Sequence, residues 1–176
     1  MTQEIEKKYL LRENGINYAT AAAPRKLFPA RGQRIKQGYL LPEDLEAICA
    51  ELKHTPSFKA DEARLRQKGI DFYLTLKGEG SLQRNEEELT ISHGFFEKYW
   101  TKTAGRRVEK VRISVPYGRY TAEIDLYADR DLIIAEVEVP TLEEAQKLIP
   151  LGKDVTEDKR YKNKNLAQQM KGGTET

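Results

Sequence analysis

Residues 120–139, YTAEIDLYADRDLIIAEVEV, contain two segments in which charged and apolar side chains alternate. Successive side chains of a β-strand point to opposite faces, so residues two apart share a face. Within 132–139 one face therefore carries Glu136 and Glu138, and the opposite face carries only apolar side chains. Two carboxylates in so apolar a run are costly to bury without a cation beside them. This stretch predicts a strand with one apolar face and one functional, acidic face.

The same alternation recurs along most of the chain. We expect eight strands, at residues 3–11, 35–41, 62–68, 71–77, 85–91, 107–115, 120–127 and 132–139. Eight short antiparallel strands favour a closed barrel, because closure removes exposed strand edges. We expect helices at 42–53, 92–101 and 141–149, and a fourth from about 157 into the tail. Residues 12–34 show no clear period and are expected to form a loop with about one helical turn.

Three of the predicted helices carry apolar stripes that need an apolar surface to cover, as Phe96 and Trp100 do in 92–101. If these helices pack on the outside of the barrel, its apolar face points outward and its charged face lines a lumen. For a single strand, a half-buried sheet with its charges in water is the simpler interpretation. Agreement among seven strands favours the lumen. The expected fold class is α+β, mainly β: a closed eight-stranded antiparallel β-barrel with helices packed outside.

The predicted lumen mixes both signs of charge. Its carboxylates are Glu4, Glu6, Glu86, Glu88, Glu123, Asp125, Glu136 and Glu138. Its cations are Lys8, Arg64, Arg66, Lys77, Lys110 and Arg112. Carboxylates without cysteine or histidine favour hard divalent cations, Mg²⁺ or Mn²⁺, and converging Arg and Lys side chains suit phosphate oxygens. Together these residue types predict a polyphosphate ligand and phosphoryl transfer.

Length and composition narrow the other possibilities. The 176 residues predict about one domain, which we place at 1–170 with a disordered tail at 171–176. With 30 basic and 28 acidic residues, bulk charge gives no support for a nucleic-acid or membrane partner. Cys49 is the only cysteine, which excludes an intrachain disulfide. No apolar run approaches the roughly 18 residues that span a bilayer, so we expect a cytoplasmic protein and leave a homodimer open.

The N-terminal segment Glu4-Ile5-Glu6-Lys7-Lys8 matches an E-x-E-x-K signature, and other charged motifs follow it in order. These are Arg64-Leu65-Arg66, Leu74-Thr75-Leu76-Lys77, Arg84 with Glu86-Glu87-Glu88, Lys110-Val111-Arg112, Glu123-Ile124-Asp125 and Glu136-Val137-Glu138. In this order they resemble the CYTH superfamily, the triphosphate tunnel metalloenzymes. Gln37-Gly38-Tyr39-Leu40 and the tail at 155–163 are most similar to its bacterial short-chain inorganic triphosphatases.

The resemblance implies a tunnel that binds a triphosphate with a divalent metal. It implies hydrolysis of inorganic triphosphate, a small-molecule substrate, to diphosphate and phosphate. A class IV-type adenylyl cyclase and another nucleotide or thiamine triphosphatase are the alternatives within the superfamily. A binding module without catalysis is disfavoured, because every charged motif is present. Segment 42–60 looks longer than its counterpart in compact members, and its role is left open.

Roles for single residues follow from the resemblance and from the shared faces. The expected metal ligands are Glu4, Glu6, Glu88, Glu123, Asp125, Glu136 and Glu138. The expected substrate-binding residues are Lys8, Arg64, Arg66, Lys77, Lys110, Arg112, Lys159 and Arg160. The expected catalytic residues are Lys8, Tyr39, Lys77 and Arg112, with Tyr39 close to a terminal phosphate. No serine, cysteine or histidine is arranged as a nucleophile, so a metal-activated water is expected to attack in line.

Overall fold

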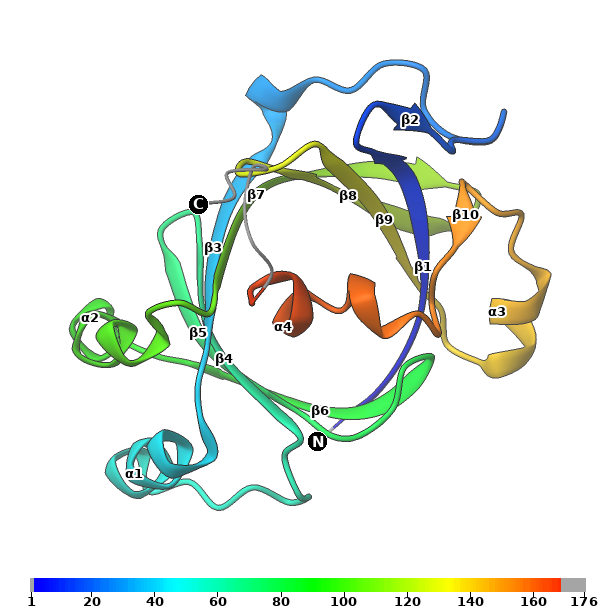
Figure 1. The fold of residues 1–176 in the computed structure, drawn as a ribbon. Helices are drawn as coiled ribbons and strands as arrows, with labels where there is room; N and C mark the ends of the chain where they lie inside the picture. Colours follow the sequence, from blue (N-terminus) through cyan, green and yellow to red (C-terminus); the bar gives the residue numbers. More distant parts are fainter. Residues whose placement is uncertain (1, 169–176) are drawn as a thin grey trace.

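The computed structural model describes residues 2–168, and strands dominate it (Figure 1). The strands are β1 (Thr2–Glu13), β2 (Ile16–Asn17), β3 (Gln33–Tyr39), β4 (Glu62–Lys68), β5 (Asp71–Lys77), β6 (Gln83–Thr90), β7 (Arg107–Tyr117), β8 (Tyr120–Tyr127), β9 (Leu132–Glu138) and β10 (Lys153–Asp154). The α-helices are α1 (Pro42–Leu52), α2 (His93–Trp100), α3 (Leu142–Lys147) and α4 (Asn163–Leu166). Short 3-10 turns are η1 (Pro29–Arg31), η2 (Thr101–Thr103) and η3 (Lys159–Tyr161).

Eight of the strands close into a barrel. The hydrogen-bonded order is β1-β6-β5-β4-β3-β7-β8-β9, and an additional pairing of β9 with β1 completes the circuit. Every pairing in the circuit is antiparallel. The two-residue strands β2 and β10 pair only with β1. The eight-stranded barrel expected from the sequence is therefore confirmed.

The predicted strands differ from the observed ones mainly at their ends. Strands 62–68, 71–77 and 120–127 have the predicted bounds, and β7 extends two residues past the predicted 115 to Tyr117. Its hairpin with β8 turns at Gly118, whose φ of 58° lies in the left-handed region that glycine adopts without strain. The expected loop at 12–34 contains the end of β1, the short β2 and one helical turn, η1.

The apolar faces of the strands point outward and are covered by helices. Ile48 of α1 and Phe96 of α2 pack with Leu65 of β4 and Leu74 of β5 in one buried cluster. On the other side of the barrel, Ala145 of α3 packs in a second cluster with side chains from β1, β8 and β9. Burial of these apolar surfaces stabilises the barrel from outside and leaves its charged faces inside.

One end of the barrel is closed by the C-terminal segment, and α4 lies across the opening in the view of Figure 1. Leu166 of α4 and Tyr161 of η3 are buried with inward-facing Tyr39, Val108 and Tyr127. The segment is also held by hydrogen bonds from Lys162 Nζ to the carbonyl of Gly80 at 2.8 Å and from Lys8 Nζ to the carbonyl of Tyr161 at 3.1 Å. The predicted fourth helix is therefore a 3-10 turn and a short helix that close the barrel.

Within residues 2–168, no helix is both long and apolar enough to cross a membrane. The tail at 171–176, which the sequence predicts to be disordered, lies outside the described residues. The single domain at 1–170 stays a prediction.

Glu87 fixes the connection between α1 and β4, part of the segment whose role the sequence left open. It lies on the outward face of β6, where it accepts hydrogen bonds from His54 Nε2 at 2.6 Å and from the backbone N–H of Ser57 at 2.9 Å. The hydroxyl of Ser57 also donates to it. Those hydrogen bonds, that of the hydroxyl foremost, lower the pKa of Glu87 from 4.5 to about 2. The segment is thus attached to the outside of the barrel.

Replacement of Glu87 by Gln is expected to lower the free energy of unfolding by about 1 kcal/mol at neutral pH, because a buried charge-assisted acceptor is lost. The pKa of Glu87 is depressed in the folded state, so its contribution is present above the unfolded value of 4.5 and is lost as the pH falls towards 2. Urea unfolding of wild type and Glu87→Gln across this range measures the difference. A difference that stays constant down to pH 2 would contradict this account.

Candidate active site

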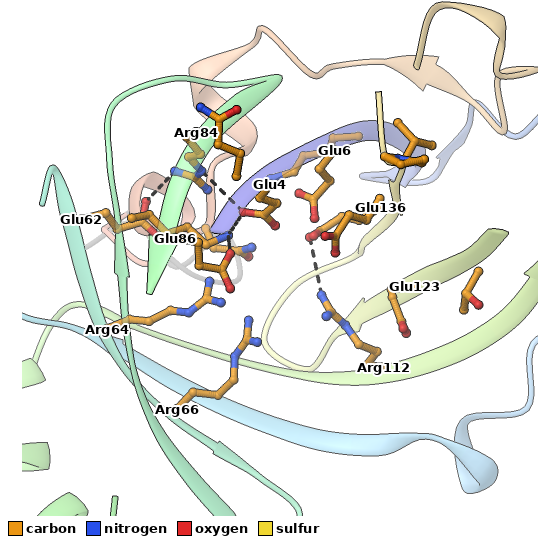
Figure 2. A pocket seen from close by; sticks show the side chains of 18 residues that line it. Glu4, Glu6, Glu62, Arg64, Arg66, Arg84, Glu86, Arg112, Glu123 and Glu136 are labelled. Carbon is orange, nitrogen blue, oxygen red and sulfur yellow. Dashed lines mark hydrogen bonds and ion pairs between the residues drawn. The ribbon is translucent and has the colours of Figure 1, made fainter. Parts of the chain in front are cut away.

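The barrel encloses a cavity of about 570 Å³ whose lining is mostly charged (Figure 2). The structure brings together, from strands far apart in the sequence, ten of the predicted site residues. They are Glu4, Glu6, Lys8, Arg64, Arg66, Lys77, Arg112, Glu123, Glu136 and Glu138. Alternation along each strand therefore places these side chains on the inner face, as the sequence predicts.

Arg64 and Arg66 of β4 reach into the cavity without a neutralising partner. Both are nearly buried, and neither has a carboxylate oxygen within 4.0 Å in the part of the chain that the structure describes. Gln37 of β3 holds Arg66, because its Oε1 accepts hydrogen bonds from Nε at 3.1 Å and Nη2 at 3.0 Å. Burial and the charge of Arg64 lower the pKa of Arg66 to about 10, so this guanidinium stays charged at neutral pH. Two adjacent guanidinium groups of this kind suit a phosphate oxyanion.

The cations of β5 and β6 are paired with carboxylates instead. Lys77 Nζ lies 2.8 Å from Glu4 and 3.4 Å from Glu86, and Arg84 Nη1 donates to Glu62 at 3.3 Å. Burial opposes ionisation of Glu4, but the ammonium of Lys77 outweighs it and holds the pKa at about 2. Burial and the hydrogen bond with Glu4 raise the pKa of Glu86 to about 7. This wall of the cavity is close to charge balance.

The negative charge of a group of carboxylates on β1 and β9 is not fully balanced by neighbouring cations. Glu6 and Glu138 are directly opposite each other in the β1–β9 ladder. Burial, and then the negative charges of Glu136 and Glu4, raise the pKa of Glu6 well above its usual value. Burial and Glu4 also raise the pKa of Glu138. Glu136 Oε1 is buried without a hydrogen-bond partner, although Arg112 Nη2 lies 3.6 Å away.

These carboxylates fit a hard divalent cation by their donor chemistry. The group supplies only oxygen donors and an unsatisfied buried oxygen, which Mg²⁺ and Mn²⁺ prefer. Among residues 2–168, however, no three acidic, histidine or cysteine side chains are arranged as a ready set of ligands. Glu4 is engaged by Lys77 in this arrangement. A metal would therefore have to displace existing contacts as it binds.

Lys110 and Asp125 are not among the residues that line the cavity, and neither side chain is exposed. Lys110 Nζ is 2.6 Å from Asp125 Oδ2, and Arg112 donates to both oxygens of Asp125 at 2.7 and 2.9 Å. Burial lowers the pKa of Lys110 to about 7, although Asp125 acts against this. The sequence predicted a phosphate ligand in Lys110 and a metal ligand in Asp125. In the structure Asp125 binds both Lys110 and Arg112, and neither Lys110 nor Asp125 is among the residues that line the cavity, so the two ligand roles stay predictions.

Four further predicted residues are not brought to the cavity. Tyr39 is packed into the closed end of the barrel, where its hydroxyl accepts a hydrogen bond from Gln37 Nε2 at 2.7 Å. Glu88 is exposed and accepts a hydrogen bond from Thr75 Oγ1 at 3.1 Å. Lys159 and Arg160 are exposed in η3 on the far side of the closing segment. The positions of these four side chains depend on packing between elements that are far apart in the sequence, which no local pattern indicates.

The lining also includes Glu62 and Asn163, which sequence reasoning missed, and Arg84, which it named within a motif without giving it a role in the site. A signal existed for Glu62 and Arg84, because Glu62 continues the face of Arg64 and Arg84 continues the face of Glu86 at a spacing of two. Asn163 reaches the cavity only because α4 folds back across the barrel. No local pattern could have indicated that.

Comparison with known proteins finds related chains. No family model matches this sequence. An inorganic triphosphatase from Nitrosomonas europaea is 48% identical over 113 residues, which cover 60% of this chain and 74% of that protein. An inorganic triphosphatase from Acetivibrio thermocellus is 30% identical over 174 residues, which cover 96% of this chain and 95% of that protein.

A crystal structure of an inorganic triphosphatase has the same barrel. It superposes with a TM-score of 0.61 at 35% sequence identity and covers 98% of this chain and 99% of that one. The alignment therefore extends over nearly the whole of both chains.

Replacement of Gln37 by Glu tests the role of the unpaired guanidinium groups. The new carboxylate would pair with Arg66 and reduce its attraction for an anion, so we expect about tenfold weaker binding of inorganic diphosphate, used as a probe anion. Isothermal titration calorimetry measures the affinity. Gln37→Met, which adds no charge, is the control and is expected to cost less. Equal affinity of wild type and Gln37→Glu would contradict the assignment of Arg66 to anion binding.

Proposed function

Because the chain belongs to the inorganic triphosphatase family of the CYTH superfamily, we propose that it hydrolyses inorganic triphosphate to diphosphate and phosphate inside the barrel cavity. The observation that carries this proposal is the pair of unneutralised guanidinium groups, Arg64 and Arg66, which face a group of carboxylates in one enclosed space. The cations attract a short polyanion. The carboxylates would repel it unless a further cation accompanies it.

The lining residues divide the work of binding. Arg64 and Arg66 bind the phosphate oxygens and orient the chain of phosphates. Arg112 is held by Asp125 at 2.7 Å and presents its guanidinium from β7, which is separated from β4 only by β3 (Figure 2). Lys8 and Lys77 complete the cage, and positive groups fixed in advance stabilise the charge that develops on the leaving diphosphate.

A divalent cation, Mg²⁺ or Mn²⁺, belongs to this proposal. Glu4, Glu6, Glu136 and Glu138 would hold it, with Glu123 nearby in the lining. When bound, such an ion neutralises phosphate charge and lowers the pKa of a coordinated water. In the part of the chain that the structure describes, the lining contains no serine, cysteine or histidine, so water is the expected nucleophile and no covalent intermediate is expected.

The alternatives would need contacts for an organic group. A cyclase, a nucleotide triphosphatase or a thiamine triphosphatase must hold a base or a ring beside the phosphates. Among residues 2–168, no aromatic side chain lines the barrel cavity, which supports a small inorganic substrate.

Metal dependence is the first test of this function. Glu138→Gln is expected to lower kcat for triphosphate by about a hundredfold, because a carboxylate that holds the metal is lost. Release of phosphate, measured with Mg²⁺ and with excess EDTA, checks both the variant and the metal requirement. Glu109→Gln, which changes an exposed residue of β7, is the matched control. Full activity of wild type in EDTA would refute the metal site.

Selectivity is the second test. Inorganic triphosphate presents charge at both ends of a short chain, whereas ATP has one free end and an adenosine that the cavity lining does not contact. We expect kcat/KM for triphosphate to exceed that for ATP by about a hundredfold, which corresponds to roughly 2.7 kcal/mol of transition-state stabilisation. Saturation curves for triphosphate, ATP and thiamine triphosphate measure it. Equal efficiency on ATP, or cyclic AMP as the main product, would favour a nucleotide enzyme.

A further inference from the structure

The balanced overall charge of the chain conceals one strongly basic segment. Between Glu13 and Glu43 the sequence contains five cations and no acidic residue. Four of these cations lie within residues 24–34, which are called the basic arm here. They are Arg25, Lys26, Arg31 and Arg34. Such a block, in a chain whose net charge is only +2, indicates a surface with its own electrostatic field.

The basic arm lies at the open end of the barrel, opposite the end that α4 closes. It contains η1 and leads into the first residues of β3, whereas Tyr39, the last residue of β3, is packed in the closed end. In Figure 1 the connection between β2 and β3 runs outside the ring of strands. Leu27 of the arm packs against the outer apolar cluster of β1, β8 and β9. This packing attaches the arm to the barrel and leaves its charged side chains at the surface.

The cations of the basic arm are available to a partner. All four are exposed, and none has a carboxylate oxygen within 4.0 Å of its charged group among the described residues 2–168. Exposed cations elsewhere are often neutralised, as Lys98 is by Glu51 at 2.9 Å and Lys147 by Glu143 at 2.8 Å. The arm therefore presents a local excess of positive charge that suits an anionic partner.

Two large apolar side chains are exposed beside these cations. Phe28 of the arm is 53% exposed, and Ile70, at the tip of the β4–β5 hairpin, is 89% exposed. The hairpin tip is joined to the arm, because the backbone N–H of Gly69 donates to the carbonyl of Arg34 at 3.2 Å. The guanidinium of Arg31 lies 5.2 Å from the centre of the Phe28 ring, so this surface presents an aromatic and a cationic group together. Exposed apolar side chains among cations are typical of a surface that binds a membrane.

We propose that the basic arm and the tip of the β4–β5 hairpin bind the surface of a membrane that contains anionic phospholipids. The exposed cations face the lipid phosphates, and Phe28 and Ile70 enter the boundary between headgroups and acyl chains. An RNA strand would also attract the cations, but it offers no apolar medium for an aliphatic side chain such as Ile70. This surface lies outside the barrel cavity, so its binding does not depend on hydrolysis of triphosphate.

Co-sedimentation with lipid vesicles tests this surface. The full chain is mixed with vesicles of phosphatidylcholine alone, or of phosphatidylcholine with phosphatidylglycerol, and the bound fraction is measured as the lipid concentration rises. We expect binding only to the vesicles that contain phosphatidylglycerol. The double variant Arg25→Gln/Lys26→Gln is expected to weaken this binding about twenty-fivefold, since each cation near an anionic surface contributes about fivefold. Added salt is expected to weaken the binding of wild type, because it screens the attraction.

Two further sets of variants test the apolar contacts and the position of the charge. Phe28→Ser and Ile70→Ser are each expected to weaken binding to the anionic vesicles about threefold, because insertion of an apolar side chain is lost. Lys53→Gln/Lys59→Gln is the matched control, because it removes two exposed cations from the connection between α1 and β4. We expect this control to bind the vesicles as wild type does. Far-UV circular dichroism checks that each variant is folded.

Each other outcome overturns the proposal. If Arg25→Gln/Lys26→Gln binds anionic vesicles as wild type does, the basic arm is not the contact surface. If Lys53→Gln/Lys59→Gln loses as much binding, the attraction reflects only the net charge of the chain. If single-stranded RNA, measured by fluorescence anisotropy, binds more tightly than the vesicles and Ile70→Ser has no effect, the arm is an RNA interface. None of these results bears on the proposed hydrolysis, which release of phosphate from triphosphate tests separately.

Discussion

Compensation of charge inside a closed barrel is the constraint on which this structure depends. The clearest case is Asp125, a fully buried carboxylate that binds Lys110 at 2.6 Å and accepts two hydrogen bonds from Arg112. A single unpaired charge at that depth would cost several kcal/mol, whereas a pair with complete hydrogen bonding is tolerated. Asp125 therefore does more than balance charge. It fixes the guanidinium of Arg112, which lines the barrel cavity.

The residues suited to binding a ligand are those whose charge is not neutralised by a neighbour of opposite sign. On β4, Arg64 and Arg66 have no carboxylate partner among the described residues, and a neutral amide, Gln37, holds one of them in place. On β1 and β9, burial and the charges of Glu136 and Glu4 raise the pKa of Glu6, and burial and Glu4 raise the pKa of Glu138. An excess of positive charge on one wall and of negative charge on the other describes a site for an anion accompanied by a cation.

Apolar packing on the outside of the barrel allows its interior to be lined by charged side chains. Apolar side chains on the outer faces of β4 and β5 pack against α1 and α2, and those of β1, β8 and β9 pack against α3. An ordinary small barrel has its apolar side chains inside. Here helices take over the role of the core, so the inner faces are free for charged groups. Inside the barrel, a cluster of apolar side chains lies at the closed end, around Tyr127 and Leu166.

The sequence by itself determined the strands, their faces and the barrel, because alternation at a spacing of two is a local property of extended backbone. It also placed most of the charged lining, including Glu136 and Glu138, on one inner face. Only the tertiary structure decided which charges neutralise each other. Lys110 and Arg112 have the same spacing and face as Arg64 and Arg66, yet Lys110 and Arg112 are bound to Asp125, whereas Arg64 and Arg66 have no carboxylate partner within 4.0 Å among the described residues. That difference arises from the register between β7 and β8, which sets Arg112 opposite Asp125 and which no local pattern encodes. The return of the C-terminal segment, which joins residues as distant as Lys8 and Tyr161, is likewise a property of the tertiary structure alone.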